Sequence, residues 1–151
     1  MSWINYEQIK RRADLLPEEQ VTVSVAEVLA WEGLSVISIS SNYKHSRHPI
    51  LNDICPARHS AGFDLLVADE CRQKIGVEVK TKLTMNSFQN ALGQALVYLH
   101  NGDAKSAMIF SRKFHDEKTF KKIRAIMTNI NEPIIIRTLE AIGQHRTRQI
   151  W

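Results

Sequence analysis

Three charged residues lie within two short segments that are otherwise rich in apolar residues. Asp64 lies in the segment 63–68, and Glu78 and Lys80 alternate with valines in the segment 75–81. Because alternate residues of a β-strand share one face, Glu78 and Lys80 should lie side by side. A carboxylate among apolar residues is costly to bury unless it is paired or binds a metal ion. If the two segments form a hairpin, Asp64 and Glu78 can converge on one cation.

This combination of residue types suits the hydrolysis of phosphodiester bonds. Two carboxylates suffice to hold Mg²⁺, which keeps several water ligands and accepts phosphate oxygens. Such an ion activates water and stabilises the pentavalent phosphate. Lys80 would orient the attacking water or neutralise charge on the phosphate. The alternative is a cross-strand ion pair on a solvated sheet face, which is the ordinary meaning of Glu-x-Lys in a strand.

The surrounding sequence predicts an α/β fold in which helices flank a central mixed β-sheet. Helices are expected from apolar stripes and capping residues: one around Ile4, Ile9 and Ala13, one from Pro17 to Gly33, one capped by Asn86 or Ser87 and ending at Asn101-Gly102, and one capped by Asp116 with a stripe reaching Ile130. Strands are expected at residues 34–40, 63–68, 75–81, 107–111 and 134–136. The second and third of these strands should form an antiparallel hairpin.

Size, composition and charge limit the class of protein. The chain has 151 residues, of which 44% are hydrophobic, and this predicts one domain over residues 1–151. The net charge of +4 and the pI near 9.2 favour polyanionic partners. No apolar run has the length of a signal peptide or a membrane span, so we expect an intracellular, cytoplasmic protein; association with a nucleoid or a viral origin is compatible with this. Cys55 and Cys71 are too few for a disulfide framework, which favours a reducing compartment.

A long polar segment, residues 41–62, separates the first two predicted strands. Its basic residues Lys44, Arg47 and Arg58 either contact substrate phosphates or simply solubilise the loop. The same segment contains residues of the types that bind zinc: His45, His48, Cys55 and His59. Their spacing matches no compact structural zinc site, so a solvated basic loop is the preferred interpretation.

A second group of basic residues surrounds the last predicted helix, and its members are Lys113, Lys118, Lys121, Lys122 and Arg124. They form either the solvated face of that helix or an extension of a surface that binds nucleic acid.

Asp64, followed by Glu78-Val79-Lys80 after a short hairpin, resembles the motif of the PD-(D/E)xK nucleases, and the resemblance covers residues 17–111. Phe63 stands where the motif has proline, a variation that occurs within the family. The resemblance implies a restriction-endonuclease-like αβββαβ core, in which Asp64 and Glu78 bind Mg²⁺ or Mn²⁺ and Lys80 assists catalysis.

Two further elements of the family are expected on helices. Gln94 and Tyr98 are similar to the Gln-x-x-x-Tyr element of RecB-like members, and their spacing of four places them on one helix face. The alternative is a polar helix edge on which the tyrosine ring packs. Family members often draw a further acidic residue from the first helix of the core, for which Glu27 is the candidate and Glu19 the reserve.

The expected function is therefore that of a Mg²⁺- or Mn²⁺-dependent endonuclease that cleaves DNA. The small size resembles Holliday-junction resolvases, which implies a homodimer acting on branched or single-stranded DNA. Contacts to DNA are expected from Lys44, Arg47, Arg58, Lys82 and Tyr98. Two alternatives stay open: a nuclease-fold protein without turnover that binds nucleic acid or a partner, and an RNA-cleaving, toxin-like enzyme using the same residues.

Overall fold

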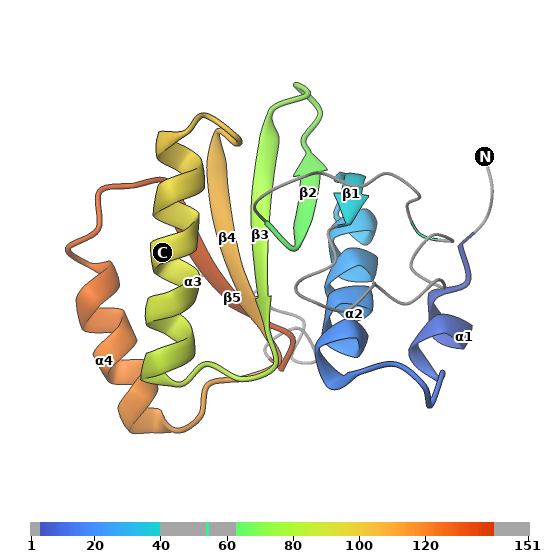
Figure 1. Cartoon of the computed structure of the whole chain (residues 1–151), viewed down its shortest axis with the longest axis horizontal. Coiled ribbons are helices and arrows are strands. Elements are labelled where there is room, and N and C mark those ends of the chain that lie inside the picture. The colour runs from blue at the N-terminus through green and yellow to red at the C-terminus, as the bar shows by residue number, and fades with distance from the viewer. Residues whose placement is uncertain (1–3, 40–53, 55–62, 141–151) are drawn as a thin grey trace.

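The computed structural model describes residues 4–39, 54 and 63–140 (Figure 1). Predictions that concern residues 40–53, 55–62 and 141–151 lie outside this part of the chain. The elements are α1 (Tyr6–Lys10), α2 (Pro17–Trp31), β1 (Ser35–Ile39), β2 (Leu65–Ala68), β3 (Lys74–Lys80), α3 (Met85–His100), β4 (Ser106–Ser111), α4 (Glu117–Met127) and β5 (Ile134–Thr138).

The strands form one five-stranded sheet in the order β1-β2-β3-β4-β5. The pairs β1/β2 and β2/β3 are antiparallel, and the pairs β3/β4 and β4/β5 are parallel. The predicted α/β fold with a mixed sheet flanked by helices is therefore confirmed, and so is the antiparallel hairpin. The central strand, β3, is the second strand of this hairpin and also begins the parallel half of the sheet.

Apolar side chains cover both faces of the sheet and divide into two clusters. Residues from α1 and α2 pack with Val77, Val79 and Phe110 on one face. Residues from α3 and α4 pack with Ile109 and Ile136 on the other face. Figure 1 shows the two helix pairs on opposite sides of the strands. Since β3 lies between two apolar layers, any charged residue on its middle section is removed from water.

The predicted limits of α2 are confirmed. Pro17 takes the first helical position, where its missing N–H costs nothing. The Glu19 carboxylate accepts a hydrogen bond from the backbone N–H of Leu16 at 2.9 Å, which satisfies a donor at the helix start. Gly33 follows the helix with a φ of +89°, a conformation that favours glycine at a helix end.

The predicted cap of α3 was wrong by two or more residues, because the helix is capped by Thr84 rather than by Asn86 or Ser87. The Thr84 hydroxyl accepts a hydrogen bond from Ser87 N–H at 3.0 Å, and the Ser87 hydroxyl accepts one from Thr84 N–H at 2.9 Å. A reciprocal box of this kind needs two residues three positions apart, which places Ser87 inside the helix as the third residue.

The other helices differ from expectation only in length. Asp116 caps α4 as predicted and accepts a hydrogen bond from Thr119 N–H at 2.7 Å. That helix ends at Met127, before Ile130, and α1 ends before Ala13. None of the helices in the described residues is long and apolar enough to cross a membrane.

A partly buried ion pair connects the end of α2 to β5, the edge strand of the sheet. Arg137 on β5 donates two hydrogen bonds to the Glu32 carboxylate, at 2.7 and 2.5 Å. The Arg137 guanidinium also lies 5.1 Å from the ring centroid of Phe110, its neighbour on β4. This contact fixes how α2 lies across the sheet, and therefore where the first residues of α2 are placed.

Candidate active site

Asp64 and Glu78 face each other across the β2/β3 hairpin. The register pairs Leu65 with Val77, so that Asp64, one residue before β2, lies opposite Glu78. Both side chains are buried, with exposed fractions of 4% for Asp64 and 1% for Glu78. The backbone N–H of Val79 donates a hydrogen bond to Asp64 Oδ2 at 2.7 Å, which fixes this carboxylate against β3. The hairpin thus brings the two predicted metal ligands together.

The hydrogen-bonding capacity of one buried carboxylate oxygen of Glu78 is not satisfied by the described residues. Glu78 Oε1 has no hydrogen-bond partner among the described residues. A buried acceptor left in this state costs roughly 1–3 kcal/mol, and native structures contain few of them. This oxygen therefore lacks a hydrogen-bond donor or a positive group as a partner. A proton or a cation bound at this oxygen would be such a partner.

The surroundings of Glu78 oppose its negative charge. Burial is the largest cause that raises its pKa, to about 9, and the charge of Asp64 acts in the same direction. The charge of Lys80 opposes this shift, while the charge of Glu18 adds to it. At neutral pH the Glu78 carboxyl in the metal-free protein therefore holds its proton. Lys80, the half-buried last residue of β3, is close enough to act on Glu78 electrostatically.

A glycine and two aromatic rings support this carboxylate pair. A Cβ atom at Gly76 would lie 2.1 Å from the ring of Phe63, so the ring occupies space that only glycine leaves open. The same ring packs edge-to-face on Tyr98, with centroids 5.0 Å apart. Because Phe63 directly precedes Asp64, the packing of the Phe63 ring restrains the backbone position of Asp64.

Tyr98 lies on the side of α3 that is next to the site. Burial raises the pKa of Tyr98, and the charges of Glu78 and Asp64 raise it further, which places the phenol within electrostatic reach of the carboxylates. Gln94 lies one helical turn earlier on the same side, and it is exposed. The catalytic role of Gln94 and the nucleic-acid contact of Tyr98 stay predictions.

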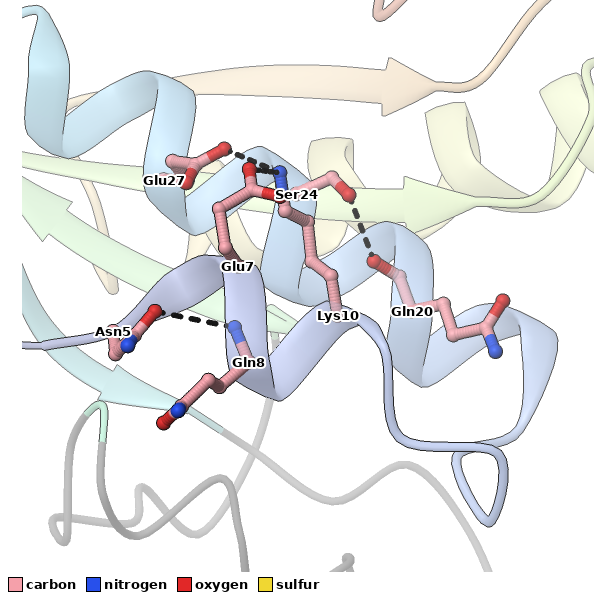
Figure 2. A network of polar contacts seen from close by, with 7 residues as sticks. All are labelled: Asn5, Glu7, Gln8, Lys10, Gln20, Ser24 and Glu27. Atoms are coloured by element: carbon pink, nitrogen blue, oxygen red, sulfur yellow. Dashed lines mark hydrogen bonds and ion pairs between the residues drawn. The ribbon is translucent and has the colours of Figure 1, made fainter.

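The acidic residues of α2 occupy three different environments. Glu27 accepts a hydrogen bond from Lys10 Nζ at 2.7 Å, and Lys10 also contacts Glu7 at 2.8 Å, so this group joins α1 to α2 (Figure 2). Glu19 caps the helix start. Glu18 is the residue of this helix whose charge reaches Glu78. The role predicted for Glu27 stays a prediction, whereas Glu18 was overlooked, although its place in the first turn could have signalled it.

The remaining predicted residues are only partly covered by the described chain. The basic residues Lys44, Arg47 and Arg58 and the zinc-type residues His45, His48, Cys55 and His59 lie outside it. Lys82 is described and half-buried, two residues beyond Lys80. Within the described part, no group of three or more His, Cys, Asp or Glu side chains is arranged to hold a metal ion, so the site is a pair of carboxylates.

Comparisons with family models, with curated proteins and with solved structures found no match to this chain. What can be said of its activity therefore rests on its own residues.

The raised pKa of Glu78 predicts a pH dependence of stability. An unfolded Glu78 has a pKa of 4.5, against about 9 in the fold, so between these values the native state holds a proton that the unfolded state has lost. The contribution of Glu78 to stability is therefore complete below about pH 4.5 and declines as the pH rises toward 9. Urea unfolding of the metal-free protein from pH 5.5 to 9 should show this decline, and Glu78→Gln should flatten it. Glu70→Gln, at an exposed turn, is the control; an equal slope in Glu78→Gln and the unsubstituted protein would contradict the assignment.

The contact between Gly76 and Phe63 predicts a strong coupling between the two positions. Gly76→Ala should destabilise the protein by about 1–3 kcal/mol, because the added methyl meets the Phe63 ring. In a Phe63→Ala background the same change should cost much less, since the ring is gone. Gly93→Ala is the matched control: nothing lies within 4 Å of its Cβ position, so it should stabilise α3 by up to about 1 kcal/mol. Denaturant unfolding of these variants tests the coupling, which fails if Gly76→Ala costs the same in both backgrounds.

Proposed function

We propose that this protein is a metal-dependent nuclease of the PD-(D/E)xK type that hydrolyses phosphodiester bonds in DNA. The observation that carries the proposal is the buried pair of Asp64 and Glu78, with Glu78 Oε1 lacking a hydrogen-bond partner among the described residues and Lys80 next to it. A solvated cross-strand ion pair is a poor account of these residues, because both carboxylates are almost fully removed from water and the charge of Asp64 helps to raise the pKa of Glu78.

The donor set suits Mg²⁺ or Mn²⁺. Both ions favour carboxylate oxygens, and a buried oxygen without a partner is a ready ligand. Asp64 and Glu78 would hold the ion, and Glu18 is the nearby acid that would contribute through its charge or through a bridging water. When bound, the ion would supply an activated water and stabilise negative charge on the phosphate.

The chain's own residues have separate tasks in this proposal. The Val79 N–H keeps Asp64 oriented toward Glu78. Lys80 would donate to the attacking water or to a phosphate oxygen, in a site where burial strengthens its charge. Tyr98 lies against the Phe63 ring and would close the α3 side of the site, with Gln94 beside it at the surface.

The order of elements supports the same class of protein. The run α2-β1-β2-β3-α3-β4 has the sequence of helices and strands expected for a restriction-endonuclease-like αβββαβ core. By analogy with small members of that class, the proposed enzyme selects its DNA by structure, in the manner of Holliday-junction resolvases, and acts as a homodimer.

Two observations favour a second candidate, a nuclease-fold protein that binds nucleic acid without turnover. Glu27 forms an ion pair with Lys10, and the described residues contain no metal site with three side-chain ligands. Digestion of branched, duplex and single-stranded DNA and of RNA, with and without Mg²⁺ or Mn²⁺, separates the candidates. Cleavage that needs the metal supports the enzyme, cleavage of RNA alone supports the toxin-like alternative, and binding without cleavage supports the second candidate.

Lys80 and Lys74 lie at opposite ends of β3 and offer a matched comparison. Lys80→Met should slow cleavage, because it removes the cation beside the reacting phosphate. The expected rise in the activation free energy is about 2–4 kcal/mol. Lys74→Met removes the same charge from an exposed position and should leave the rate unchanged. Single-turnover cleavage at saturating metal measures both, and equal rates for the two variants would reject this role of Lys80.

Glu18 and Glu27 lie on one helix, and their substitution should affect different properties of the protein. Glu18→Gln should weaken metal binding and cleavage while melting is nearly unchanged. Glu27→Gln should reduce stability by up to about 1 kcal/mol through loss of the partly exposed Lys10 pair, with metal affinity retained. Metal titration and thermal melting of both variants decide which glutamate serves the site; the reverse pattern would restore Glu27 as the candidate.

A further inference from the structure

Beyond the carboxylate pair, three cations gather where β3 and β4 end. Lys82 follows β3 by two residues, and Arg112 and Lys113 directly follow β4. We call these three residues the strand-end cluster. The two segments stay paired past the strands: Leu83 N–H donates to the carbonyl of Lys113 at 2.9 Å, and His115 N–H donates to the carbonyl of Leu83 at 2.9 Å. The backbone segments that carry the cluster are therefore adjacent in space, although Lys82 and Arg112 lie about thirty residues apart in the chain.

The strand-end cluster lies next to the candidate active site. Lys80 pairs with Ser111 across the parallel strands, and Arg112 is the residue after Ser111. Lys82 lies two residues beyond Lys80, a separation of at most about 7 Å along an extended chain. The cluster therefore lies within a few residues of Lys80 on both strands. Figure 1 shows the connections that follow β3 and β4 running together at the same end of the sheet.

Hydrogen bonds hold the backbone of the cluster in place, and its three side chains have no ion-pair partner among the described residues. Ser87 Oγ donates to the carbonyl of Lys82 at 2.8 Å, so the helix cap of α3 fixes this residue. The backbone N–H of Glu140 donates to the carbonyl of Arg112 at 3.0 Å. The Arg112 and Lys113 side chains are exposed and Lys82 is half-buried. None of the three forms an ion pair with a described residue.

Acidic residues near the cluster do not neutralise it within the described structure. The Asp116 carboxylate caps α4 through Thr119 and lies 3.8 Å from His115. Glu140, which is exposed, is joined to Arg112 through the backbone and not through its carboxylate. The result is a group of three positive charges, on a backbone held by hydrogen bonds, beside the candidate active site.

We propose that the strand-end cluster binds successive phosphate groups of the nucleic-acid substrate and directs the strand across Lys80 into the site. This inference rests on the proposed function and specifies which surface holds the substrate. Lysine and arginine contacts of this kind read the backbone and not the base sequence, so the cluster would give affinity and orientation without sequence preference. From the sequence, Lys82 was expected to contact DNA, and Lys113 belonged to a basic group with an extension of such a surface as one of its two interpretations. Arg112 joins them because the parallel strands end together.

The opposite end of the same two strands provides the control. Lys74 begins β3 and Lys105 precedes β4, and the backbone N–H of Lys105 donates to the carbonyl of Lys74 at 2.9 Å. Both lysines are exposed. Arg112→Ala with Lys113→Ala removes two charges from the strand-end cluster, whereas Lys74→Ala with Lys105→Ala removes two charges at the far end. The net charge of the two double variants is equal.

Binding of a fluorescent 20-base-pair DNA duplex in metal-free buffer, at several salt concentrations, tests the proposal without cleavage. The Arg112/Lys113 double variant should bind at least about tenfold more weakly, and its slope of log affinity against log salt should be shallower by about 0.9 for each lost contact. The Lys74/Lys105 double variant should keep the slope of the unsubstituted protein. Melting curves check that both variants fold, and the truncations keep every backbone hydrogen bond of the cluster.

The outcomes separate this inference from the proposed function. Equal losses in both double variants, or no binding by the unsubstituted protein, would overturn the strand-end cluster as the substrate surface. Cleavage in Mg²⁺ with binding that ignores Arg112 and Lys113 would keep the nuclease and reject the cluster. Binding that depends on the cluster in a protein that never cleaves DNA would support the cluster and reject the nuclease.

Discussion

Burial of two neighbouring carboxylates has two costs in free energy. Each carboxylate loses its hydration, and the two negative charges repel each other. Asp64 and Glu78 are in this position, at 4% and 1% exposure. The fold does not relieve the cost with an internal partner for Glu78 Oε1, since none exists among the described residues. The metal-free protein instead keeps a proton on Glu78, whose pKa is about 9. A divalent cation would replace that proton and remove the repulsion, so binding and stability are linked at this site.

The rest of the sheet holds this arrangement in place. β3 is central, and α2 and α3 cover its two faces, so neither carboxylate can turn to water. The absence of a side chain at Gly76 admits the Phe63 ring, and that ring meets Tyr98 on α3. Arg137 and Glu32 fix α2 on the opposite face, which keeps the start of that helix, and with it Glu18, near β3.

Local patterns were sufficient to predict the parts of the site that depend on one strand or one hairpin. Alternation places Glu78 and Lys80 together, and the hairpin register brings Asp64 opposite, so these residues could be found from their spacing. The acidic residue of α2, for which the sequence offered Glu27 and Glu19, could not be identified in this way. Which glutamate approaches Glu78 depends on the direction in which α2 crosses the sheet and on Lys10, a residue of another helix that pairs with Glu27. The cap of α3 was misplaced because Ser87 is the inner partner of a box whose outer member, Thr84, had not been considered. Arg112 and Lys113 approach Lys80 only through the parallel pairing of β3 and β4, which no local pattern reveals.

The most direct test of the buried carboxylate pair as a metal site is a calorimetric titration of Mn²⁺ into the metal-free protein near pH 7.5, in two buffers of different ionisation enthalpy. Saturable binding is expected, with release of about one proton per ion, because Glu78 has to give up its proton to become a ligand. Glu78→Gln should lose both the tight binding and the proton release, whereas Glu70→Gln should keep them. Tight Mn²⁺ binding that survives Glu78→Gln, or no saturable binding by the unsubstituted protein, would contradict the assignment.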